Sequence, residues 1–374
     1  MSNRTPATRK FTILGVTVLG SLILTINPGS TSTKVAVFEG QSLIWSETLR
    51  HEAEKLARFS DVAGQYSFRN TAVLGALEQH GTTLDALACV VGRGGILKPL
   101  AGGTYKINDL MLEELRQGKW GQHASNLGAL IAHEIAMLIK VPAFIVDPPV
   151  VDEMEPLARV TGMPELVRKS MFHALNQKAI ARRAATSLGK DLSECNLVVA
   201  HLGGGVSVGA HAGGRVIDVN NALDGEGAFS PERSGGLPAG DLVRMATSGK
   251  YSPAEVLKKI TGQGGIVAYL GTNDAREVEQ RIEAGDSHAR LIYEGMAYQA
   301  VKEIGAYAAV LAGKVDAVVI TGGIAHSKFL VDFIQTRVSF IAPVLVFPGE
   351  DEMLALAEGG LRVLLGHEQA REYS

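Results

Sequence analysis

The sequence contains one strand-and-turn pattern twice, once in each half of the chain. Residues 23–44 read ILTINPGSTSTKVAVFEGQSLI, and residues 197–217 read LVVAHLGGGVSVGAHAGGRVI. Each copy starts with an apolar run, passes through a turn of small residues into a second strand-like run, and then through a glycine turn into a third. Short apolar runs bounded by such turns predict β-hairpins, and an internal repeat outweighs a single motif. The repeat therefore predicts a duplicated fold.

The turns of small residues in both copies are suited to binding phosphate. The first carries the hydroxyl groups of Ser30 and Ser32 with the charge of Lys34 beside them, and the second is the glycine run 203–205. Such a turn can direct several backbone N–H groups and hydroxyls into one concavity, where they bind phosphate oxygens. Two phosphate-type hairpins predict a nucleotide bound between the two halves of the chain.

Length, composition and charge restrict the class of protein. A chain of 374 residues with 46% hydrophobic residues favours two domains with their own cores. The formal net charge of −3 provides no positive field for nucleic acid or an anionic membrane. Cys89 and Cys195 lie in or beside apolar runs without zinc-site spacing, so buried, reduced thiols in a cytoplasmic protein are expected.

The N-terminal residues have some features of a signal peptide. Basic residues at positions 4, 9 and 10 precede an apolar run over 11–26. This run is shorter than the roughly 20 residues that a spanning helix needs, has no A-x-A-like cleavage site and continues into the first predicted strand. We therefore expect residues 1–20 to be a dispensable extension.

Several polar residues follow predicted strands, where α/β proteins keep their binding sites. Arg93 lies in a glycine turn after the strand 88–91, and Asp147 ends the strand 143–146. Gly322 and Gly323 follow the strand 317–321, a strand-to-helix junction suited to close contact with a nucleotide.

Two histidines are placed at predicted helix starts. His123 precedes a helix over 125–139, and His173 is expected in the first turn of a helix over 170–188. The N-terminal N–H groups of a helix favour anions. Three further helices are expected over 252–312, and the alternation of strands and helices in each half gives an α/β class.

The common nucleotide-binding signatures, G-x-x-x-x-G-K-[ST] and G-x-G-x-x-G after a strand, do not occur in register. A glycine-rich hairpin cradle used twice resembles the superfamily of acetate and sugar kinases, heat-shock ATPases and actin. The resemblance narrows to the butyrate kinase branch of the acetate kinase (acetokinase) family, and it covers nearly the whole chain after Ser21. It is carried by NPGSTSTK (27–34), HASNLGA (123–129), FHALNQK (172–178), HLGGG (201–205), ERSG (232–235), TGGIAH (321–326) and FPGEDE (347–352).

The resemblance implies a duplicated actin-like (ribonuclease H-like) α/β fold with a nucleotide cleft between two domains. Residues 21–150 with 350–374 would form the N-terminal domain, on the acyl and first-phosphate side. Residues 151–349 would form the C-terminal domain, on the second-phosphate and adenosine side. A homo-oligomer, at least a dimer, is also implied.

The implied reaction is the reversible, Mg-ATP-dependent phosphorylation of butyrate, or a related short or branched-chain fatty acid, to an acyl phosphate by direct in-line transfer. A carboxylate, with a pKa of roughly 4 to 5, is ionised at neutral pH and needs no base to activate it. It must, however, approach a polyanionic phosphate. Arginines and a metal ion should therefore dominate the site.

The resemblance also assigns roles to individual residues. Arg93 and Arg233 correspond to the two active-site arginines, one for the acyl carboxylate and one for the migrating phosphoryl group. His173 corresponds to the histidine that stabilises that group, His123 to one near the substrate, and Asp147 to a carboxylate that orients the metal or an arginine.

The remaining implied positions bind ATP and magnesium. Asn27 and Glu352 resemble the magnesium pair, which acts mainly through water. The positions for ATP are Ser30, Ser32, Lys34, His201, Gly203, Gly204, Gly205, Asp274, Arg276, Gly322, Gly323 and His326. Asp274 and Arg276 are equally consistent with a helix start that carries a local ion pair.

Other functions remain open at this stage. Acetate kinases carry asparagine where this chain has Gly204, a difference that favours a longer acid over acetate or propionate. A sugar kinase-like enzyme of the superfamily would need Asp147 as a base. A nucleotide-switched binding protein would need neither arginine.

Overall fold

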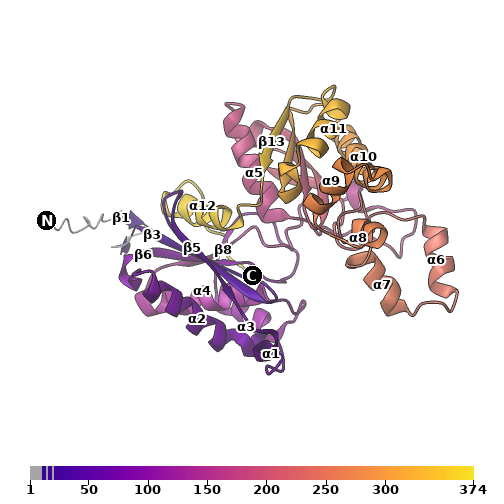
Figure 1. The fold of residues 1–374 in the computed structure, drawn as a ribbon. Helices are drawn as coiled ribbons and strands as arrows, with labels where there is room; N and C mark the ends of the chain where they lie inside the picture. The colour runs from indigo at the N-terminus through magenta and orange to yellow at the C-terminus, as the bar shows by residue number, and fades with distance from the viewer. Residues whose placement is uncertain (1–10, 14–15, 19–20) are drawn as a thin grey trace. The chain divides into compact units, whose positions relative to one another are not determined.

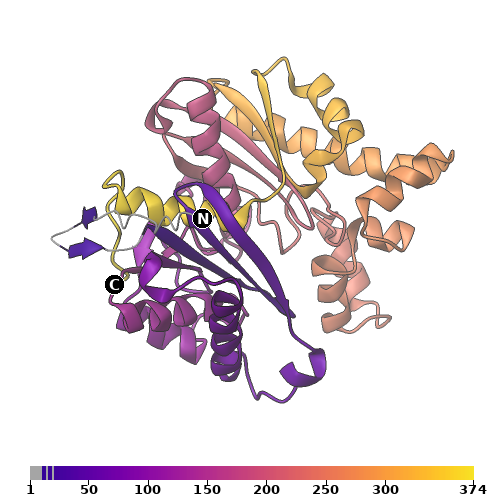
Figure 2. The same cartoon turned by 60° about the vertical axis from the view of Figure 1, so that its left-hand side comes forward.

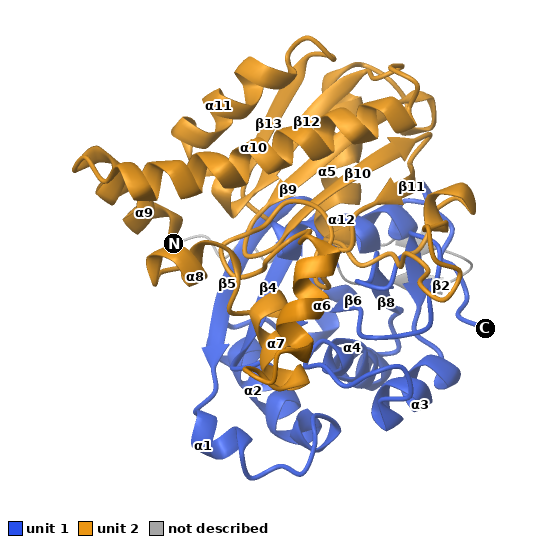
Figure 3. Ribbon diagram, turned by 90° about the vertical axis from the view of Figure 1, so that its right-hand side faces the viewer, with its two compact units in different colours: residues 1–151, 351–374 blue, residues 152–350 orange. Residues whose placement is uncertain are grey.

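The computed structural model describes residues 11–13, 16–18 and 21–374, which form two compact units (Figures 1 and 3). The first unit consists of the described residues up to Val151 together with Asp351–Ser374, and the second of Asp152–Glu350. Within the expected extension, residues 1–10, 14–15 and 19–20 lie outside the described residues. Its described parts are the strands β1 (Phe11–Ile13) and β2 (Val16–Val18), which pair antiparallel.

The first unit is built on a six-stranded mixed sheet with the order β5-β4-β3-β6-β8-β7. Strands β3, β6 and β8 run parallel, and β4, β5 and β7 pair antiparallel with their neighbours. The strands are β3 (Leu22–Pro28), β4 (Ser32–Glu39), β5 (Ser42–Arg50), β6 (Leu87–Arg93), β7 (Thr104–Lys106) and β8 (Ala143–Val146). Every residue of β6 before Arg93 is buried, as expected of a strand covered on both faces.

Helices cover both faces of this sheet. Figures 1 and 2 show α2, α3 and α4 on one face and α12 on the other. The helices are α1 (Ala53–Leu56), α2 (Tyr66–Gln79), α3 (Asp109–Gln117), α4 (Asn126–Ile139) and α12 (Glu352–Leu364), with short 3-10 turns at Ala63–Gln65 and Leu84–Ala86. Helix α3 has Asn108 as its N-cap and Gly118, in the left-handed region, as its C-cap.

Helix α4 approaches strand β6 closely because both elements carry a glycine at the contact. A Cβ atom on Gly92 would lie 2.2 Å from the carbonyl oxygen of Gly128, and one on Gly128 would lie 2.4 Å from the carbonyl oxygen of Arg93. No side chain larger than hydrogen can be placed at either position without a shift of backbone. The pair therefore brings the start of α4 against the end of β6.

The second unit is built on a five-stranded sheet with the order β11-β10-β9-β12-β13. Its strands are β9 (Asn196–Leu202), β10 (Val206–Ala212), β11 (Arg215–Val219), β12 (Ala317–Gly322) and β13 (Val344–Pro348). Helix α5 packs on one face and α10 on the other, with α11 beside α10 (Figures 1 and 3). The helices are α5 (Ala174–Ser187), α6 (Ala239–Thr247), α7 (Pro253–Thr261), α8 (Gly265–Leu270), α9 (Ala275–Glu283), α10 (Ser287–Val310) and α11 (Lys328–Val338), with 3-10 turns at Leu157–Arg159, Leu192–Glu194 and Gly323–His326.

The two sheets share one topology. Three antiparallel strands, β5-β4-β3 in the first sheet and β11-β10-β9 in the second, lie side by side. Next to β3 lie β6 and β8, and next to β9 lie β12 and β13, and these pairs run parallel to β3 and β9. Strands β9 and β10 are the second copy of the repeated hairpin, and β3 and β4 are the first. The predicted duplicated α/β fold is confirmed.

Cys89 and Cys195 are buried free thiols, as predicted, and burial raises the pKa of both. Among the helices of the described residues, none has the length and apolar character needed to cross a bilayer.

Two helix predictions are wrong. Helix α5 begins at Ala174, and His173 occupies its N-cap position with non-helical φ −80° and ψ 63°, so it precedes the first turn. The region 252–312 holds four helices instead of three, because the six-residue α8 is separate. Its N-terminal glycine packs on the loop before it, where a Cβ on Gly265 would lie 1.8 Å from the carbonyl oxygen of Ser230. A helix this short has no readable period in the sequence.

The contact between α4 and β6 can be tested with two helical glycines. Gly128→Ala should lower the free energy of unfolding by at least about 1 to 3 kcal/mol, because the added methyl overlaps the carbonyl of Arg93. Gly75→Ala in α2 is the control: nothing lies within 4 Å of its Cβ position, so alanine should stabilise the protein by roughly 0.5 to 1 kcal/mol. Urea unfolding of the full chain measures both, and equal effects of the two substitutions would contradict the packing described.

Candidate active site

The site residues of the first unit gather at the carboxyl edge of the parallel strands. Asn27, near the end of β3, pairs with Lys34 of β4. Strand β3 aligns Ile26 with Gly92 of β6, and β6 aligns Arg93 with the last residue of β8, which directly precedes Asp147. The register alone thus places Asn27, Lys34, Arg93 and Asp147 along one edge.

Arg93, Glu352 and Asn27 form a charged cluster at this edge. The Nη1 atom of Arg93 forms an ion pair with Oε1 of Glu352, and Nδ2 of Asn27 donates to Oε2 of the same carboxylate at 2.7 Å. Glu352 is the first residue of α12, which brings the C-terminal segment onto this edge. The Arg93 side chain is 17% exposed and makes no other hydrogen bond to the described residues, so its remaining N–H groups can bind an anion.

The predicted magnesium pair therefore lies in direct contact. Carboxylate and amide oxygens are ligands that Mg²⁺ accepts, so Asn27 and Glu352 suit it chemically. Within the described ranges, no group of three or more His, Cys, Asp and Glu side chains could hold a metal ion. A metal at this cluster would take most of its ligands from water and from the phosphates of a substrate.

His123 is an exposed residue three positions ahead of the first residue of α4. Its Nδ1 accepts from the backbone N–H of Ser125 at 3.2 Å and lies 2.9 Å from the Ser125 hydroxyl, which places the ring proton on Nε2. Partial burial and the positive charge of Arg93 lower the pKa of His123. The neutral ring is thus a hydrogen-bond donor near Arg93.

Asp147 is buried and bound to backbone. Its Oδ1 accepts from the N–H of Gly103 at 2.7 Å, and its own N–H donates to the Gly103 carbonyl at 3.0 Å. The residue is 1% exposed and has a left-handed φ of 37°. Its observed contacts hold the turn at Gly103 against the end of β8.

The first phosphate-type turn is held from behind by a residue that the sequence did not indicate. Arg69 of α2 is fully buried, and its guanidinium donates to the carbonyl oxygens of Gly29, Ser30 and Ser32 at 2.8, 3.0 and 2.9 Å. Burial lowers the pKa of Arg69. By taking up these carbonyls, Arg69 fixes the turn, whose Ser30 and Lys34 side chains are exposed.

The second unit brings together His173, His201 and Arg233 around its glycine turn. The two imidazole rings are stacked, with centroids 3.8 Å apart and planes 12° from parallel. A Cβ atom on Gly205 would lie 2.1 Å from Nη1 of Arg233 and 3.2 Å from Cε1 of His173. Only glycine at this position allows the arginine and the histidine to lie against the turn.

Arg233 is a largely buried cation. Its Nη1 donates to the carbonyl of Ala222 at 2.8 Å, its Nε is buried without a hydrogen-bond partner among the described residues, and no described carboxylate forms an ion pair with it. Burial lowers the pKa of Arg233, with the opposing influence of Glu232 and Asp224 smaller. A desolvated guanidinium of this kind binds an anionic group strongly.

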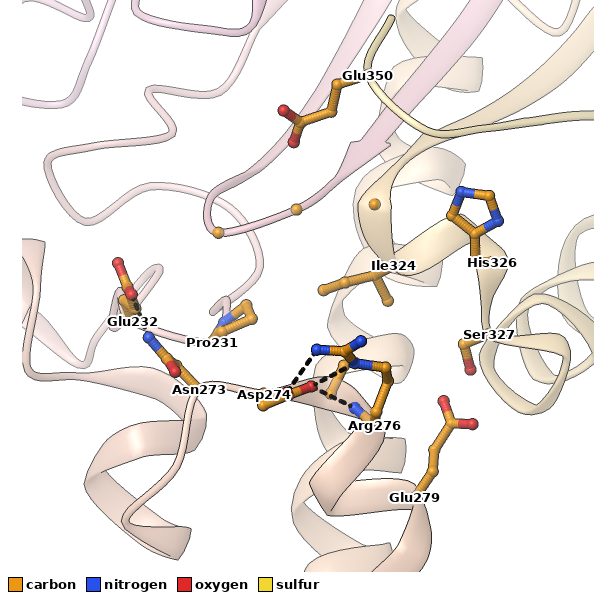
Figure 4. Close-up of a pocket in the computed structure, with 14 residues that line it drawn as sticks. Pro231, Glu232, Asn273, Asp274, Arg276, Glu279, Ile324, His326, Ser327 and Glu350 are labelled. Carbon is orange, nitrogen blue, oxygen red and sulfur yellow. Dashed lines mark hydrogen bonds and ion pairs between the residues drawn. The ribbon is translucent and has the colours of Figure 1, made fainter. Parts of the chain in front are cut away.

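Beside these residues lies a cavity of about 510 Å³, drawn in Figure 4. Its size is that of a pocket for a small organic ligand. Six of the predicted ATP-binding residues line it: Gly203, Gly204, Asp274, Arg276, Gly323 and His326. The apolar side chains of Pro231 and Ile324 and the polar Asn273 and Ser327 also line it, which suits the flat base and hydroxylated sugar of a nucleoside.

Asp274 and Arg276 also make the alternative arrangement considered from the sequence. Asp274 caps α9 by accepting from the N–H of Arg276 at 2.9 Å, and their side chains form an ion pair at 2.9 Å (Figure 4). Both residues also line the cavity, so the helix cap does not withdraw their side chains from it.

Each predicted site residue thus falls into one of two groups. Those at the edge of the first sheet are Asn27, Ser30, Ser32, Lys34, Arg93, His123, Asp147 and Glu352. Those around the second glycine turn and its cavity are His173, His201, Gly203, Gly204, Gly205, Arg233, Asp274, Arg276, Gly322, Gly323 and His326. Besides Arg69, the residues missed from the sequence are the buried Gln177 and Ser207, which contact His173 or its partners.

A family model and a curated relative both match this sequence and point to the same family. A model of the acetokinase family matches residues 156–370. Butyrate kinase 2 of Clostridium acetobutylicum is 58% identical over 351 residues, which cover 94% of this chain and 99% of that protein.

Solved structures share the fold. The acetate kinase of Porphyromonas gingivalis is 20% identical with a TM-score of 0.75, over 92% of this chain and 100% of that one. A propionate kinase from Francisella tularensis is 19% identical with a TM-score of 0.71, over 91% of this chain and 98% of that one. These structural relatives support the two-domain actin-like architecture.

The positive charge of Arg93 lowers the pKa of His123, and this effect can be measured. The arginine disfavours the imidazolium, so Arg93→Ala should raise the pKa of His123 toward its ordinary value of about 6.5. Proton NMR titration of the histidine ring protons measures this. His51, whose pKa is lowered by burial and by Arg69, is the internal control and should not move. An unchanged or lower His123 pKa in the variant would contradict the arrangement.

Proposed function

The chain belongs to the acetokinase family, and we propose that its acyl substrate is butyrate or a short or branched-chain fatty acid of similar length. It is a carboxylate kinase, which transfers a phosphoryl group from ATP to a carboxyl group. The proposal for butyrate is supported by the 58% identity to butyrate kinase 2 across 99% of that protein. The proposal is also supported by Gly204, which stands where acetate kinases carry asparagine.

The environment of Arg233 supports placing the reaction centre beside it. This guanidinium is largely buried, lacks an ion pair among the described residues, and lies with His173 against the glycine turn. We propose that it neutralises the transferring phosphoryl group, since charge cancellation is the main need of a reaction between two anions.

Arg93 would hold the acyl carboxylate. Its Nη1 is committed to Glu352, and the rest of its planar fork can bind both oxygens of an acid. His123, a neutral donor beside it, would assist in placing the acid. No general base is required because the acid is already ionised, and the buried contacts of Asp147 with Gly103 agree with a positioning role for that residue.

ATP would be bound by both glycine and serine turns and by the cavity. Ser30, Ser32 and Lys34 of the first unit and the turn 203–205 with His201 of the second unit would contact phosphates, as hydroxyl, ammonium and N–H donors do. The cavity lined by Asp274, Arg276 and His326 would take the adenosine. The first unit is thus assigned the acyl and first-phosphate side, and the second unit the second-phosphate and adenosine side.

Mg²⁺ is proposed as the accompanying ion. Asn27 and Glu352 would orient it, mainly through water, and the ion would neutralise phosphate charge during transfer. Glu352 also fixes Arg93, so one carboxylate would position both the metal and the acid-binding arginine.

The cellular context is proposed from composition and resemblance. Two buried free thiols suit a reducing, cytoplasmic setting, and the near-neutral charge suits small-molecule partners without nucleic acid or membrane. A homo-oligomer, at least a dimer, is proposed from the resemblance of the whole sequence to the family.

Trapping the acyl phosphate with hydroxylamine tests the substrate and both arginines. With Mg-ATP, hydroxamate should form fastest with four- or five-carbon acids among acetate, propionate, butyrate, isobutyrate and valerate. Arg93→Ala and Arg233→Ala should each lower the rate by roughly 10²-fold or more, the usual loss for one transition-state donor. Arg244→Ala, an exposed arginine paired with Asp241, is the matched control and should stay active.

Two results would contradict the proposal. Faster turnover of acetate than of butyrate would move the substrate to the acetate or propionate type. Hydroxamate formation that survives either arginine substitution would remove that arginine from the site.

A further inference from the structure

We propose that Gln177 and Ser207 hold His173 as a neutral imidazole with its proton on Nε2, so that this histidine donates a hydrogen bond to the transferring phosphoryl group and exchanges no proton. The inference rests on the proposed function only for the identity of the group that receives the bond. The protonation pattern itself follows from contacts within the second unit.

Four side chains form a continuous chain of contacts behind the glycine turn. Nδ1 of His173 lies 2.8 Å from Oγ of Ser207, and Nε2 of Gln177 lies 2.9 Å from the same oxygen. Oε1 of Gln177 lies 3.0 Å from Nε2 of His211. Ser207 and Gln177 are fully buried and His211 is 1% exposed, so no bulk water competes for these bonds.

A backbone carbonyl fixes which atoms donate and which accept along this row of hydrogen bonds. The Ser207 carbonyl oxygen accepts from Nε2 of Gln177 at 3.0 Å, and because a carbonyl can only accept, the amide nitrogen must face Ser207. An amide nitrogen cannot accept a hydrogen bond, so Oγ of Ser207 is an acceptor toward Gln177. The same oxygen has a second lone pair and could also accept from Nδ1 of His173, but the buried hydroxyl proton would then lack an acceptor, because Oγ of Ser207 makes no third hydrogen bond to the described residues. The hydroxyl therefore donates to Nδ1 of His173. That nitrogen must therefore be unprotonated, and the ring proton is on Nε2.

His211, at the other end of this row of hydrogen bonds, agrees with the same donor and acceptor assignment. The amide orientation leaves Oε1 of Gln177 facing His211, which must donate from Nε2. Complete burial, with Lys178 nearby, lowers the pKa of His211 to about 3, with an opposing contribution from Glu153. His211 is thus a neutral ring with its proton on the nitrogen that the chain requires.

The neighbouring amide of α5 assigns the second ring of the stack. Nδ2 of Asn176 donates to the carbonyl of Glu350 at 3.0 Å, so Oδ1 of Asn176 faces Nδ1 of His201, 2.8 Å away. His201 therefore carries a proton on Nδ1. Two consecutive amides, Asn176 and Gln177, give the stacked rings opposite roles at Nδ1.

This assignment matches the chemistry of carboxylate phosphorylation. A carboxylate oxygen forms the new O–P bond, the bond from phosphorus to the oxygen of ADP breaks, and ADP leaves as an anion, so no proton is transferred. A neutral Nε2–H can donate to a phosphoryl oxygen throughout the step. A cationic His173 stacked 3.8 Å from His201 would instead add charge beside Arg233.

The protonation pattern can be read by ¹⁵N NMR of histidine-labelled full-length protein, with His173→Gln to assign the resonances. Nδ1 of His173 should give the signal of an unprotonated, hydrogen-bond-accepting nitrogen and Nε2 that of a protonated one. Ser207→Ala should abolish this preference, and Ser207→Thr, which keeps the hydroxyl, should retain it. A protonated Nδ1 in the unsubstituted protein would overturn the proposal, whatever the variants do.

Kinetics separate positioning from mere packing. Ser207→Ala should lower kcat by roughly 10-fold, the effect of one lost hydrogen bond of ordinary strength, with little change in the KM for ATP. Ser207→Thr should recover most of this loss. Cys195→Ala, a buried residue at the opposite end of the strand β9 region, is the control and should leave kcat unchanged. Wild-type kcat in Ser207→Ala would overturn the role of Ser207.

The two proposals can fail separately. If no fatty acid is phosphorylated while Nδ1 of His173 is unprotonated, the substrate assignment fails and the histidine assignment stands. If butyrate is phosphorylated but Nδ1 is protonated, only the inference about His173 fails.

Discussion

The parallel pairing of β3 with β6, and of β9 with β12, aligns the strand ends that carry Arg93 in the first unit and the two glycine turns in the second. In the first unit this register places Asn27 beside Arg93, and the ion pair of Arg93 with Glu352 then ties the start of α12 to the same edge. In the second unit the corresponding edge carries the glycine turn and the strand end at Gly322. Strands β6 and β12 are buried along their lengths before these ends, so Arg93 and the turn after Gly322 come where the buried segments stop.

In each unit, the donors of the candidate site are held by buried groups behind them. Arg69 takes up the carbonyls of the first turn, while Gln177 and Ser207 hold His173 beside the second. The side chains that would meet substrate, Arg93 and Arg233, use only part of their guanidinium groups on the protein. Fixed donors that need little reorganisation are what a transfer between two anions requires.

The sequence was sufficient for the repeat, the fold class and most strands, because apolar runs bounded by glycine are local signals. Its motifs also predicted candidate site residues, and the structure gathers these within each unit. The sequence could not reveal Arg69, Gln177 or Ser207, because their contacts join residues some 30 to 40 positions apart and depend on register. The predicted start of α5 is wrong for a related reason. His173 has non-helical backbone angles at the N-cap, and its contacts with Ser207 and His201 come from other parts of the sequence.

We propose that the phosphoryl group passes directly from ATP to the carboxylate in a site that supplies charge and hydrogen-bond donors but no nucleophile. The stereochemical course at phosphorus, measured with ATP made chiral in its γ-phosphoryl group by oxygen isotopes, tests this most directly. A single in-line transfer predicts inversion of configuration in the acyl phosphate. Retention would require two transfers through a phosphorylated side chain, with His173 the first to examine, and would contradict the account.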